Sequence, residues 1–298
     1  MRVLVSGSTG FIGSALVQAL ADAGHEPVRL VRTNRPDDFP SIVWDPANES
    51  IADHALDDID AVVHLAGESI ASSRWTDAQK ARIMDSRVKG TRTLANAMAR
   101  CDTPPSVFLS GSAIGYYGET TEPVDETGPA ADDFAAQVSV TWEAAAAPIA
   151  ETGSRLALLR TGIVYDPSGG ALGEQLLFFK LGLGGRIGDG QQWLSWISLA
   201  DEVGAIIHLL TNDVEGPVNL TAPNPVTNDE FTKALGSVLN RPTLIPIPKL
   251  ALWARLGREL SETLLERGAN VTPSVLLSSG YEFSDPELRP ALERMLNQ

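Results

Sequence analysis

The chain has 298 residues, of which 43% are hydrophobic, and a formal net charge of −15 at pH 7. This length can bury a full core. The charge argues against a nucleic-acid partner, which needs a basic surface, and opposes an anionic membrane, so neither partner is expected. Cys101 is the only cysteine, which excludes an intrachain disulfide and predicts a reducing, cytoplasmic setting. No apolar run approaches the roughly 20 residues of a spanning helix.

Residues 3–13 have the pattern of a strand, a glycine turn and a helix start. Gly7 allows the chain to turn off the strand, Gly10 allows backbone to approach a phosphate, and Gly13 allows the helix to pack closely on the sheet. The free N–H groups at the start of the helix then face the anion. The pattern predicts a dinucleotide site, in which Thr9, with the residues up to Gly13, lines the pyrophosphate.

The second strand, predicted over residues 25–32, indicates which dinucleotide binds. An NAD enzyme carries an acid at the end of this strand for the ribose 2′-hydroxyl, but this chain has Arg32. Arg29 and Arg35 lie nearby, and the first acid is Asp37. A guanidinium suits a 2′-phosphate, so we expect NADP. The alternative is that these arginines are solvated surface charges.

Strand and helix patterns alternate over about the first 165 residues. Strands are predicted at 42–44, 61–65, 107–110 and 156–160, and helices at 76–100 and 133–151. A late helix at 203–210 and a strand at 218–220 return to the same domain. This order predicts an α/β fold with a doubly wound, Rossmann-like parallel sheet. The dinucleotide-binding domain is predicted to span residues 1–165, with 198–222 returning to it.

The composition changes after residue 165. Glycines crowd residues 169–190, and Trp193 and Trp196 follow, which suits loops that close over a ligand, the alternative being a mobile surface connection. Helical segments are predicted at 227–239, 250–267 and 287–296. Residues 166–197 and 223–298 are therefore predicted to form a substrate-cleft loop and a smaller, mostly helical C-terminal domain.

Five segments resemble the extended short-chain dehydrogenase/reductases in order and spacing, namely residues 7–13, 64–67, 110–118, 160–165 and 196–201. Leu65-Ala66-Gly67-Glu68, Arg74-Trp75, Ser86-Arg87 and residues 183–196 are similar to the "epimerase family protein" subgroup, which also carries a small C-terminal domain like residues 240–298. The resemblance implies an NADP-binding Rossmann-like fold and an NADP-dependent oxidoreductase or nucleotide-sugar epimerase. The expected cofactor-binding residues are Gly7, Thr9, Gly10, Phe11, Ile12, Gly13, Arg32, Leu65, Ala66, Gly67, Glu68 and Arg87.

The sequence departs from this superfamily at the Tyr-x-x-x-Lys pair that transfers the proton. Counting back from Glu143, where the superfamily often has an acid, the pair falls on Ala135 and Ser139. Alanine has no proton to give, and serine lacks the positive charge that stabilises a tyrosinate. The loss is large, because general acid–base catalysis typically contributes about 10²–10⁴-fold.

Three hydroxyls remain as candidate catalytic groups. Ser112 matches the superfamily's substrate-positioning serine, and Tyr116 and Tyr117 follow the same strand. The alternative is that the tyrosines pack in the loop and Ser112 bonds to backbone. His64 is interpreted as a packed histidine rather than a base. The acids and histidines show no metal-ligand spacing, so no metal is expected.

Two functions follow from these residues. In the first, the protein is an enzyme that moves a hydride to or from a carbonyl or hydroxyl carbon of a small or nucleotide-linked substrate, as an oxidoreductase or an epimerase. In the second, it is an NADP(H)-binding sensor with little turnover, which the missing Tyr-x-x-x-Lys pair favours. The substrate and the oligomeric state stay open.

Overall fold

The computed structural model describes residues 1–34 and 38–296, so Arg35 and Asp37 lie outside the described residues. An eight-stranded sheet in the order β11-β7-β6-β5-β1-β2-β3-β4 forms the centre of the larger domain. All neighbouring strands are parallel except β3 and β4, which form an antiparallel hairpin. The strands are β1 (Arg2–Ser6), β2 (Glu26–Val31), β3 (Ser41–Asp45), β4 (Ser50–Ile51), β5 (Ala61–His64), β6 (Val107–Ala113), β7 (Arg155–Thr161) and β11 (Gly216–Leu220).

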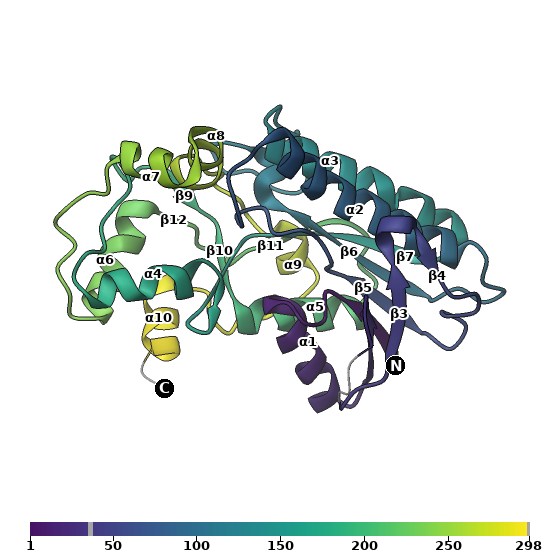
Figure 1. Cartoon of the computed structure of the whole chain (residues 1–298). Coiled ribbons are helices and arrows are strands. Elements are labelled where there is room, and N and C mark those ends of the chain that lie inside the picture. The colour runs from purple at the N-terminus through teal and green to yellow at the C-terminus, as the bar shows by residue number, and fades with distance from the viewer. Residues whose placement is uncertain (35–37, 297–298) are drawn as a thin grey trace.

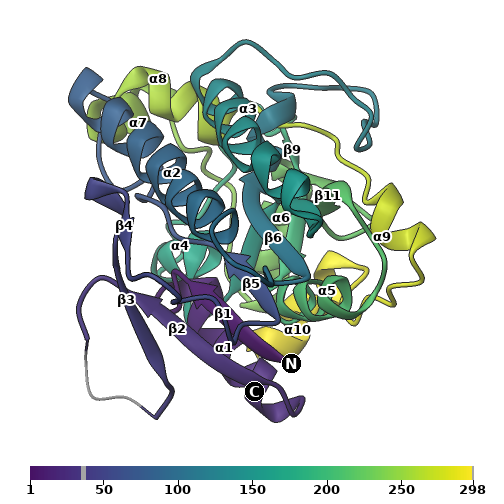
Figure 2. The ribbon, with the colours of Figure 1, turned by 90° about the vertical axis from the view of Figure 1, so that its right-hand side faces the viewer.

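Helices cover both faces of this sheet (Figures 1 and 2). The helices α1 (Phe11–Asp22) and α5 (Leu199–Thr211) pack together on one face, and α2 (Asp77–Met98) and α3 (Phe134–Ala146) pack together on the other. The central strands are buried on both faces because each is a short apolar run, such as Val3-Leu4-Val5. The predicted doubly wound sheet is confirmed.

The strand order reverses between β1 and β5. From β1 the chain builds β2, β3 and β4 to one side, and it then returns to β5, β6 and β7 on the other. In sheets of this kind ligands bind at the carboxyl ends of the strands beside this reversal. The glycine turn that follows β1 lies at this point.

Three short helical turns follow strands or helices of this domain: η1 (Pro46–Asn48), η2 (Ile114–Tyr117) and η3 (Ala147–Thr152). The α-helix predicted over 133–151 ends at Ala146 and continues as η3. Pro148 explains the change, because proline has no N–H for an α-helical hydrogen bond.

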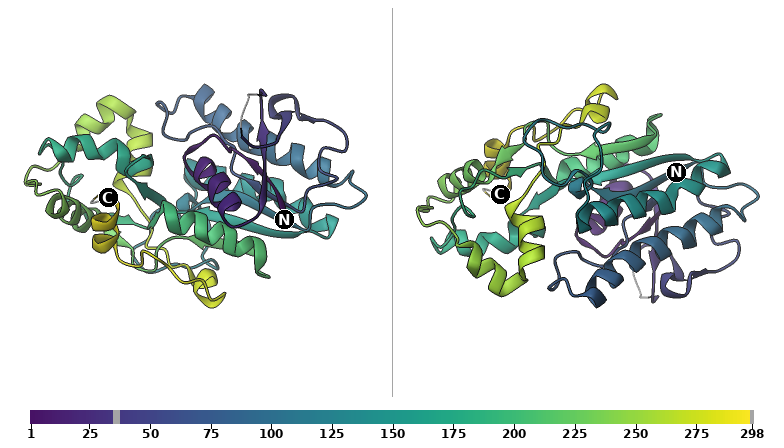
Figure 3. Two further views of the ribbon diagram at one scale, coloured as in Figure 1. Left: turned by 90° about the horizontal axis from the view of Figure 1, so that it is seen from below. Right: turned by 90° about the horizontal axis from the view of Figure 1, so that it is seen from above.

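The remaining chain forms a mostly helical region at the end of the molecule opposite β2 and β3 (Figures 1 and 3). Two small sheets pair β8 (Ile163–Asp166) with β10 (Trp196–Ser198), and β9 (Trp193–Leu194) with β12 (Val226–Thr227). The helices of this region are α4 (Gly170–Lys180), α6 (Asn228–Val238), α7 (Lys249–Leu256), α8 (Arg258–Ser261), the π-helical turn η4 (Glu262–Glu266) and α10 (Leu288–Leu296). The short helix α9 (Ser274–Ser278) packs instead against β11 of the large sheet.

This region has its own core, in which Tyr165, Phe179, Trp196 and Phe231 pack against α10. The single helix predicted over 250–267 is broken after Leu256, where Gly257 has a φ of +88°. Within residues 1–34 and 38–296, no helix is both long and apolar enough to cross a membrane.

Candidate functional site

The turn between β1 and α1 has the geometry that a bound phosphate requires. Gly7 has a φ of +68°, and the N–H of Gly10 closes the turn on the Gly7 carbonyl at 2.9 Å. A Cβ on Gly13 would lie 2.2 Å from that carbonyl oxygen, so no other residue fits where α1 crosses the turn. Gly10 is the N-cap residue of α1, and no side chain caps the helix there. Both Thr9 and Gly10 are exposed. The first N–H groups of α1 are therefore open to an anion.

The side chain of Ser6 joins this turn to the loop after β5. Its hydroxyl accepts hydrogen bonds from the N–H groups of Leu65 and Ala66 at 3.0 and 3.1 Å, and it lies 2.6 Å from Nδ1 of His64. Because the oxygen accepts both N–H groups, its own proton is directed to His64. Burial lowers the pKa of His64 to about 3, so the ring is neutral. His64 is the packed histidine that the sequence indicated.

Arg87 of α2 holds the next residues of the same loop. Its guanidinium donates to the Glu68 carbonyl at 2.9 Å and stacks on the ring of Trp142 at 4.9 Å from the centroid. Burial lowers the pKa of Arg87 to about 10, which still leaves it charged at neutral pH. A Cβ on Gly67 would lie 3.2 Å from the guanidinium carbon. The glycine turn follows β1 and this loop follows the neighbouring strand β5. The predicted residues of both segments thus lie together at the carboxyl edge of the sheet.

Arg32 follows β2 on the other side of β1, and it is exposed. It lines a surface hollow of about 390 Å³ together with Trp44 and Asp45 of β3. Arg29 of the same cluster lies on β2, with its guanidinium 5.5 Å from the ring centroid of Phe39. The structure describes Arg29 and Arg32 of this cluster, and of these two Arg32 is the exposed one, beyond the end of β2.

The candidate catalytic serine lies at the carboxyl end of β6. Ser112 is buried, and its hydroxyl donates to Oε1 of Glu143 on α3 at 2.7 Å. Arg160 of β7 binds both oxygens of Glu143, at 2.8 Å through Nε and at 3.0 Å through Nη2. The two side chains are only 4% and 12% exposed, so this is a buried bidentate ion pair. It fixes the direction of the Ser112 hydroxyl.

Tyr117 belongs to the same network. Its phenol donates to Oδ1 of Asn219 on β11 and accepts from Nη1 of Arg160, both at 2.8 Å. Burial raises the pKa of Tyr117, although the hydrogen bond from Arg160 acts in the opposite direction. The single phenol proton of Tyr117 is thus donated to Asn219 in this structure, and its catalytic role stays a prediction. Tyr116 is half-buried, and its ring stacks on Arg160 at 3.6 Å from the centroid.

The two positions of the missing pair lie on α3. Ala135 and Ser139 are both buried, and the hydroxyl of Ser139 donates to the Ala135 carbonyl at 3.0 Å within the helix. The Cβ of Ala135 lies 3.2 Å from the position that a Cβ on Gly115 would take. Ala135, the position expected for the tyrosine, is therefore packed closely against Gly115 of the turn η2.

The glycine-rich segment at 182–190 packs against the C-terminal region. The N–H of Ile187 donates to the side chain of Asn228 at 2.7 Å, and Arg186 and Gly188 exchange backbone hydrogen bonds with Ile247. A Cβ on Gly185 would lie 1.9 Å from the Ile245 carbonyl oxygen. The glycines here permit close backbone packing, and closure over a ligand stays a prediction.

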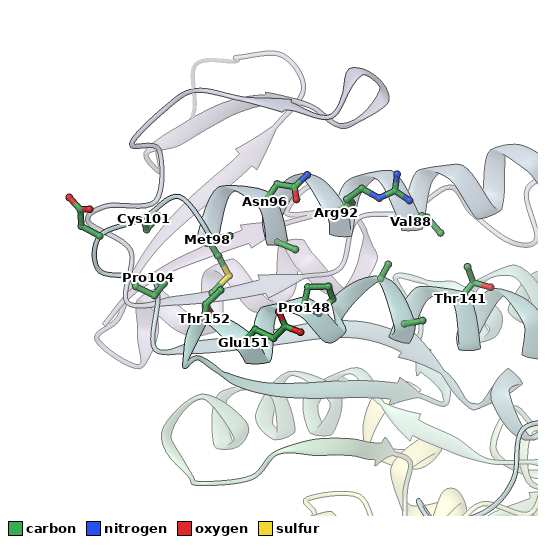
Figure 4. A pocket seen from close by; sticks show the side chains of 15 residues that line it. Val88, Arg92, Asn96, Met98, Cys101, Pro104, Thr141, Pro148, Glu151 and Thr152 are labelled. Carbon is green, nitrogen blue, oxygen red and sulfur yellow. The ribbon is translucent and has the colours of Figure 1, made fainter.

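A larger surface hollow of about 820 Å³ lies between α2 and α3 (Figure 4). Its lining includes Arg92, Asn96, Thr141 and Glu151, and none of the predicted site residues. Across residues 1–34 and 38–296, no group of three or more His, Cys, Asp or Glu residues could hold a metal ion.

Sequence reasoning missed the polar partners that order this edge of the sheet. Arg160, Asn219 and Glu202 are buried charged or polar residues inside apolar segments. Arg160 directly follows the apolar run Leu156-Ala157-Leu158-Leu159. A charged residue at the end of a buried strand needs a partner, and this was the signal from which the ion pair could have been predicted. Glu202 gives no such signal, because a first-turn acid of a helix is ordinarily exposed.

The fold and the glycine turn define a dinucleotide-binding protein of the Rossmann-like class. Residues 3–221 match the NAD dependent epimerase/dehydratase family, and residues 247–295 match a domain of unknown function, DUF1731. The chain belongs to this epimerase/dehydratase family.

Three comparisons describe its relatives. The "Epimerase family protein Mb2239" of Mycobacterium bovis is 43% identical over 292 residues, which cover 97% of this chain and 96% of the relative. The crystal structure of human epimerase family protein SDR39U1 (isoform 2) with NADPH has a TM-score of 0.92 and 37% identity, and the match covers 100% of both chains. The Thermus thermophilus UDP-glucose 4-epimerase complex with NAD has a TM-score of 0.77 at 22% identity, with 100% and 98% coverage, and it supports the fold alone.

Proposed function

We propose that this protein is an NADP(H)-dependent enzyme of the extended short-chain dehydrogenase/reductase type. It would move a hydride to or from a carbonyl or hydroxyl carbon of a small or nucleotide-linked substrate, as an oxidoreductase or an epimerase. The observation that carries the proposal is the glycine turn after β1, where the Gly7 and Gly13 backbones meet too closely for a side chain and α1 begins uncapped. The similar human structure, crystallised with NADPH, supports it.

The residues present fit a bound dinucleotide phosphate. The N–H groups at the start of α1 would hold the pyrophosphate. Beside them, the buried hydroxyl of Ser8 has no hydrogen-bond partner within residues 1–34 and 38–296. The exposed guanidinium of Arg32 would bind the 2′-phosphate, each charge-assisted hydrogen bond contributing about 1.5–3 kcal/mol. The nicotinamide, when bound, supplies or accepts the hydride.

Ser112 is the group that we expect to orient the reacting oxygen. Because its proton is donated to Glu143, its oxygen is left to accept a hydrogen bond from a substrate hydroxyl. Glu143 in turn is held by Arg160, so the lone pairs of the Ser112 oxygen keep a fixed direction. Tyr116, whose phenol is half-buried beside this network, stays a candidate for the second contact.

A specific observation favours a second function, that of an NADP(H) sensor with little turnover. Ala135 and Ser139 replace the proton-transfer pair, and the phenol of Tyr117 is committed to Asn219 and Arg160. This geometry contains no strong general acid at the expected positions. For either function we propose the cytoplasm as the compartment, on the basis of the single cysteine.

Calorimetric titration with NADPH and NADH tests the cofactor. We expect NADPH to bind more tightly, and Arg32→Asp to weaken NADPH by about 10- to 100-fold, which corresponds to one charge-assisted hydrogen bond. Arg100→Asp, at an exposed arginine beyond α2, is the control for charge and should change neither affinity. Equal affinities in the unmodified protein would contradict the assignment to NADP.

Nicotinamide absorbance, followed over a panel of carbonyl and nucleotide-sugar substrates, separates the two functions. An enzyme should consume NADPH, or exchange substrate epimers, with a rate that falls in Ser112→Ala while NADPH affinity is unchanged. Tight NADPH binding without turnover on any substrate of the panel would favour the sensor.

A further inference from the structure

Two segments of this acidic chain contain no acid. Residues 175–188 and 231–258 together hold seven lysines and arginines and no aspartate or glutamate. In the whole chain, 38 acids outnumber 23 lysines and arginines, and about one residue in eight is acidic. The charge of these segments is therefore inverted relative to the rest of the protein.

The fold brings the two segments side by side. The N–H of Ile247 donates to the Arg186 carbonyl at 2.7 Å, and Nε of Arg241 donates to the Lys180 carbonyl at 2.7 Å. The first segment is the end of α4 and the loop after it, and the second runs from α6 through the long α6–α7 connection into α7. Both lie at the end of the molecule farthest from β3 and β4 (Figure 1).

Large apolar side chains are exposed on this surface, which we name the apolar tip. Leu244 and Ile245, in the α6–α7 connection, are 88% and 77% exposed. In the part of the chain that the structure describes, seven of the eleven exposed large hydrophobic residues belong to the tip. A group of this size on one surface is typical of an interaction site. The tip consists of Leu177, Phe178, Leu181, Leu183, Leu244, Ile245 and Leu250.

Cations border the apolar tip. Lys180 and Arg241 are exposed, and among residues 1–34 and 38–296 neither forms an ion pair with an acid. Lys249 is also exposed, although it lies 3.2 Å from Glu266. The surface thus combines exposed leucine and isoleucine side chains with unneutralised positive charge.

The charges decide which partner fits. A symmetric contact with a second copy of the chain would bring two sets of the same cations, Lys180 and Arg241, into one interface. Protein interfaces are enriched in aromatic residues, whereas Phe178 is the single aromatic of the tip. A membrane surface accepts aliphatic side chains at the acyl boundary and attracts lysine and arginine when its headgroups are anionic.

We propose that the apolar tip binds the surface of a bilayer that contains anionic phospholipid. Leu244 and Ile245 enter the headgroup boundary, and Lys180 and Arg241 lie among the phosphates. The net charge of −15 opposes this contact only when it is averaged over the whole molecule. Beside the tip, Asp229 pairs with Arg186 and Lys233, and Glu266 pairs with Lys249, so Lys180 and Arg241 are the cations that turn the tip toward the membrane. The excess of acids over the rest of the chain turns the dinucleotide domain away from it. This proposal does not depend on the proposed enzymatic function.

Vesicle flotation of the full-length protein tests the proposal. One set of vesicles is pure phosphatidylcholine, and the other is an equimolar mixture with phosphatidylglycerol. We expect the protein to float with the mixed vesicles, to stay unbound with the neutral ones, and to be released by high salt. Failure to float with the mixed vesicles overturns the proposal, as does equal binding to both sets.

Variants separate the tip from the rest of the surface. Leu244→Asp combined with Ile245→Asp should reduce binding to the mixed vesicles at least about tenfold, because two apolar contacts are lost. Lys180→Glu and Arg241→Glu should each reduce it about fivefold or more. The matched controls are Leu277→Asp, at a leucine of α9 that is 51% exposed, and Arg100→Glu, and both should bind as the unmodified protein does.

Two further measurements separate lipid binding from misfolding and from self-association. Thermal unfolding should be unchanged in the Leu244→Asp/Ile245→Asp and Lys180→Glu variants, because these side chains are exposed, so that lost binding is not lost folding. Arg241→Glu also removes the hydrogen bond to the Lys180 carbonyl, so its vesicle binding is interpreted only together with its unfolding temperature. Light scattering without lipid reports the oligomeric state. If the aspartate variants convert a dimer to a monomer, the tip is a contact between copies and the membrane proposal is wrong.

Discussion

Glu202 makes the stability of this protein depend on pH. It lies in the first turn of α5, is completely buried, and accepts one hydrogen bond, from the hydroxyl of Thr161 at 2.9 Å. Among the residues that the structure describes, its second oxygen has no hydrogen-bond partner. Burial raises the pKa of Glu202 from an ordinary value of 4.5 to about 8, so the carboxyl is largely protonated in the folded protein at neutral pH.

The direction of the effect follows from these two values. Below pH 4.5 the group is protonated in both states and contributes no pH dependence. Between pH 4.5 and about 8 the unfolded chain loses the proton and the folded protein keeps it, so the free energy of unfolding falls as pH rises. The slope from this group is about 1.4 kcal/mol per pH unit, which gives roughly 4 kcal/mol between pH 5 and pH 8.

Glu202→Gln removes this titration. The amide oxygen still accepts from Thr161, and any cost of burying the amide does not vary with pH. We expect the stability of the variant relative to the unmodified protein to rise by roughly 4 kcal/mol from pH 5 to pH 8. Urea unfolding at constant ionic strength and without cofactor measures it, and Glu174→Gln, at an exposed acid of α4, controls for the loss of one carboxyl. A stability difference that stays constant over this pH range would refute the reasoning.

Three further predictions concern the dinucleotide edge. Gly13→Ala should abolish NADPH binding measured by calorimetry, because its Cβ would meet the Gly7 carbonyl oxygen at 2.2 Å, and retained affinity would contradict the tight turn. Glu143→Ala should lower the free energy of unfolding by about 3–5 kcal/mol, because Arg160 is left buried without its partner, and a loss under 1 kcal/mol in urea would argue against the ion pair. Ser6→Ala removes the acceptor of two N–H groups after β5, so NADPH affinity should fall severalfold, and unaltered binding would assign Ser6 no part in the site.

The sequence predicted the larger domain well because its signals are local. Each central strand is a continuous apolar run, and the glycine turn is defined by three residues within seven positions. The same reasoning failed where the structure depends on distant contacts. The strands β8, β9, β10 and β12 are two to four residues long, and each pairs with a segment about 30 residues away, which no local pattern reports. The helix expected over 250–267 was misjudged because Gly257 was not taken as a break.

The candidate catalytic residues illustrate the same limit. Ser112 lies at the carboxyl end of β6, and Tyr116 and Tyr117 follow it in η2, but the orientation of Ser112 and Tyr117 depends on α3, β7 and β11. Tyr117 and Asn219 are 102 residues apart in the sequence. A hydroxyl near the cofactor edge can be predicted from its position in the chain, whereas the partner that takes its proton cannot.

The network around Arg160 limits the chemistry that this edge can support. In the superfamily that the sequence resembles, a lysine supplies the positive charge that makes a tyrosine acidic. Here Arg160 is the buried cation nearest to Tyr117, but its charge is balanced by the bidentate contact with Glu143. Burial raises the pKa of Tyr117 and outweighs the lowering effect of the hydrogen bond and charge of Arg160. We infer that this site orients a substrate oxygen through Ser112 and leaves the proton to water or to the substrate itself, which restricts fast turnover to substrates that need little general acid assistance.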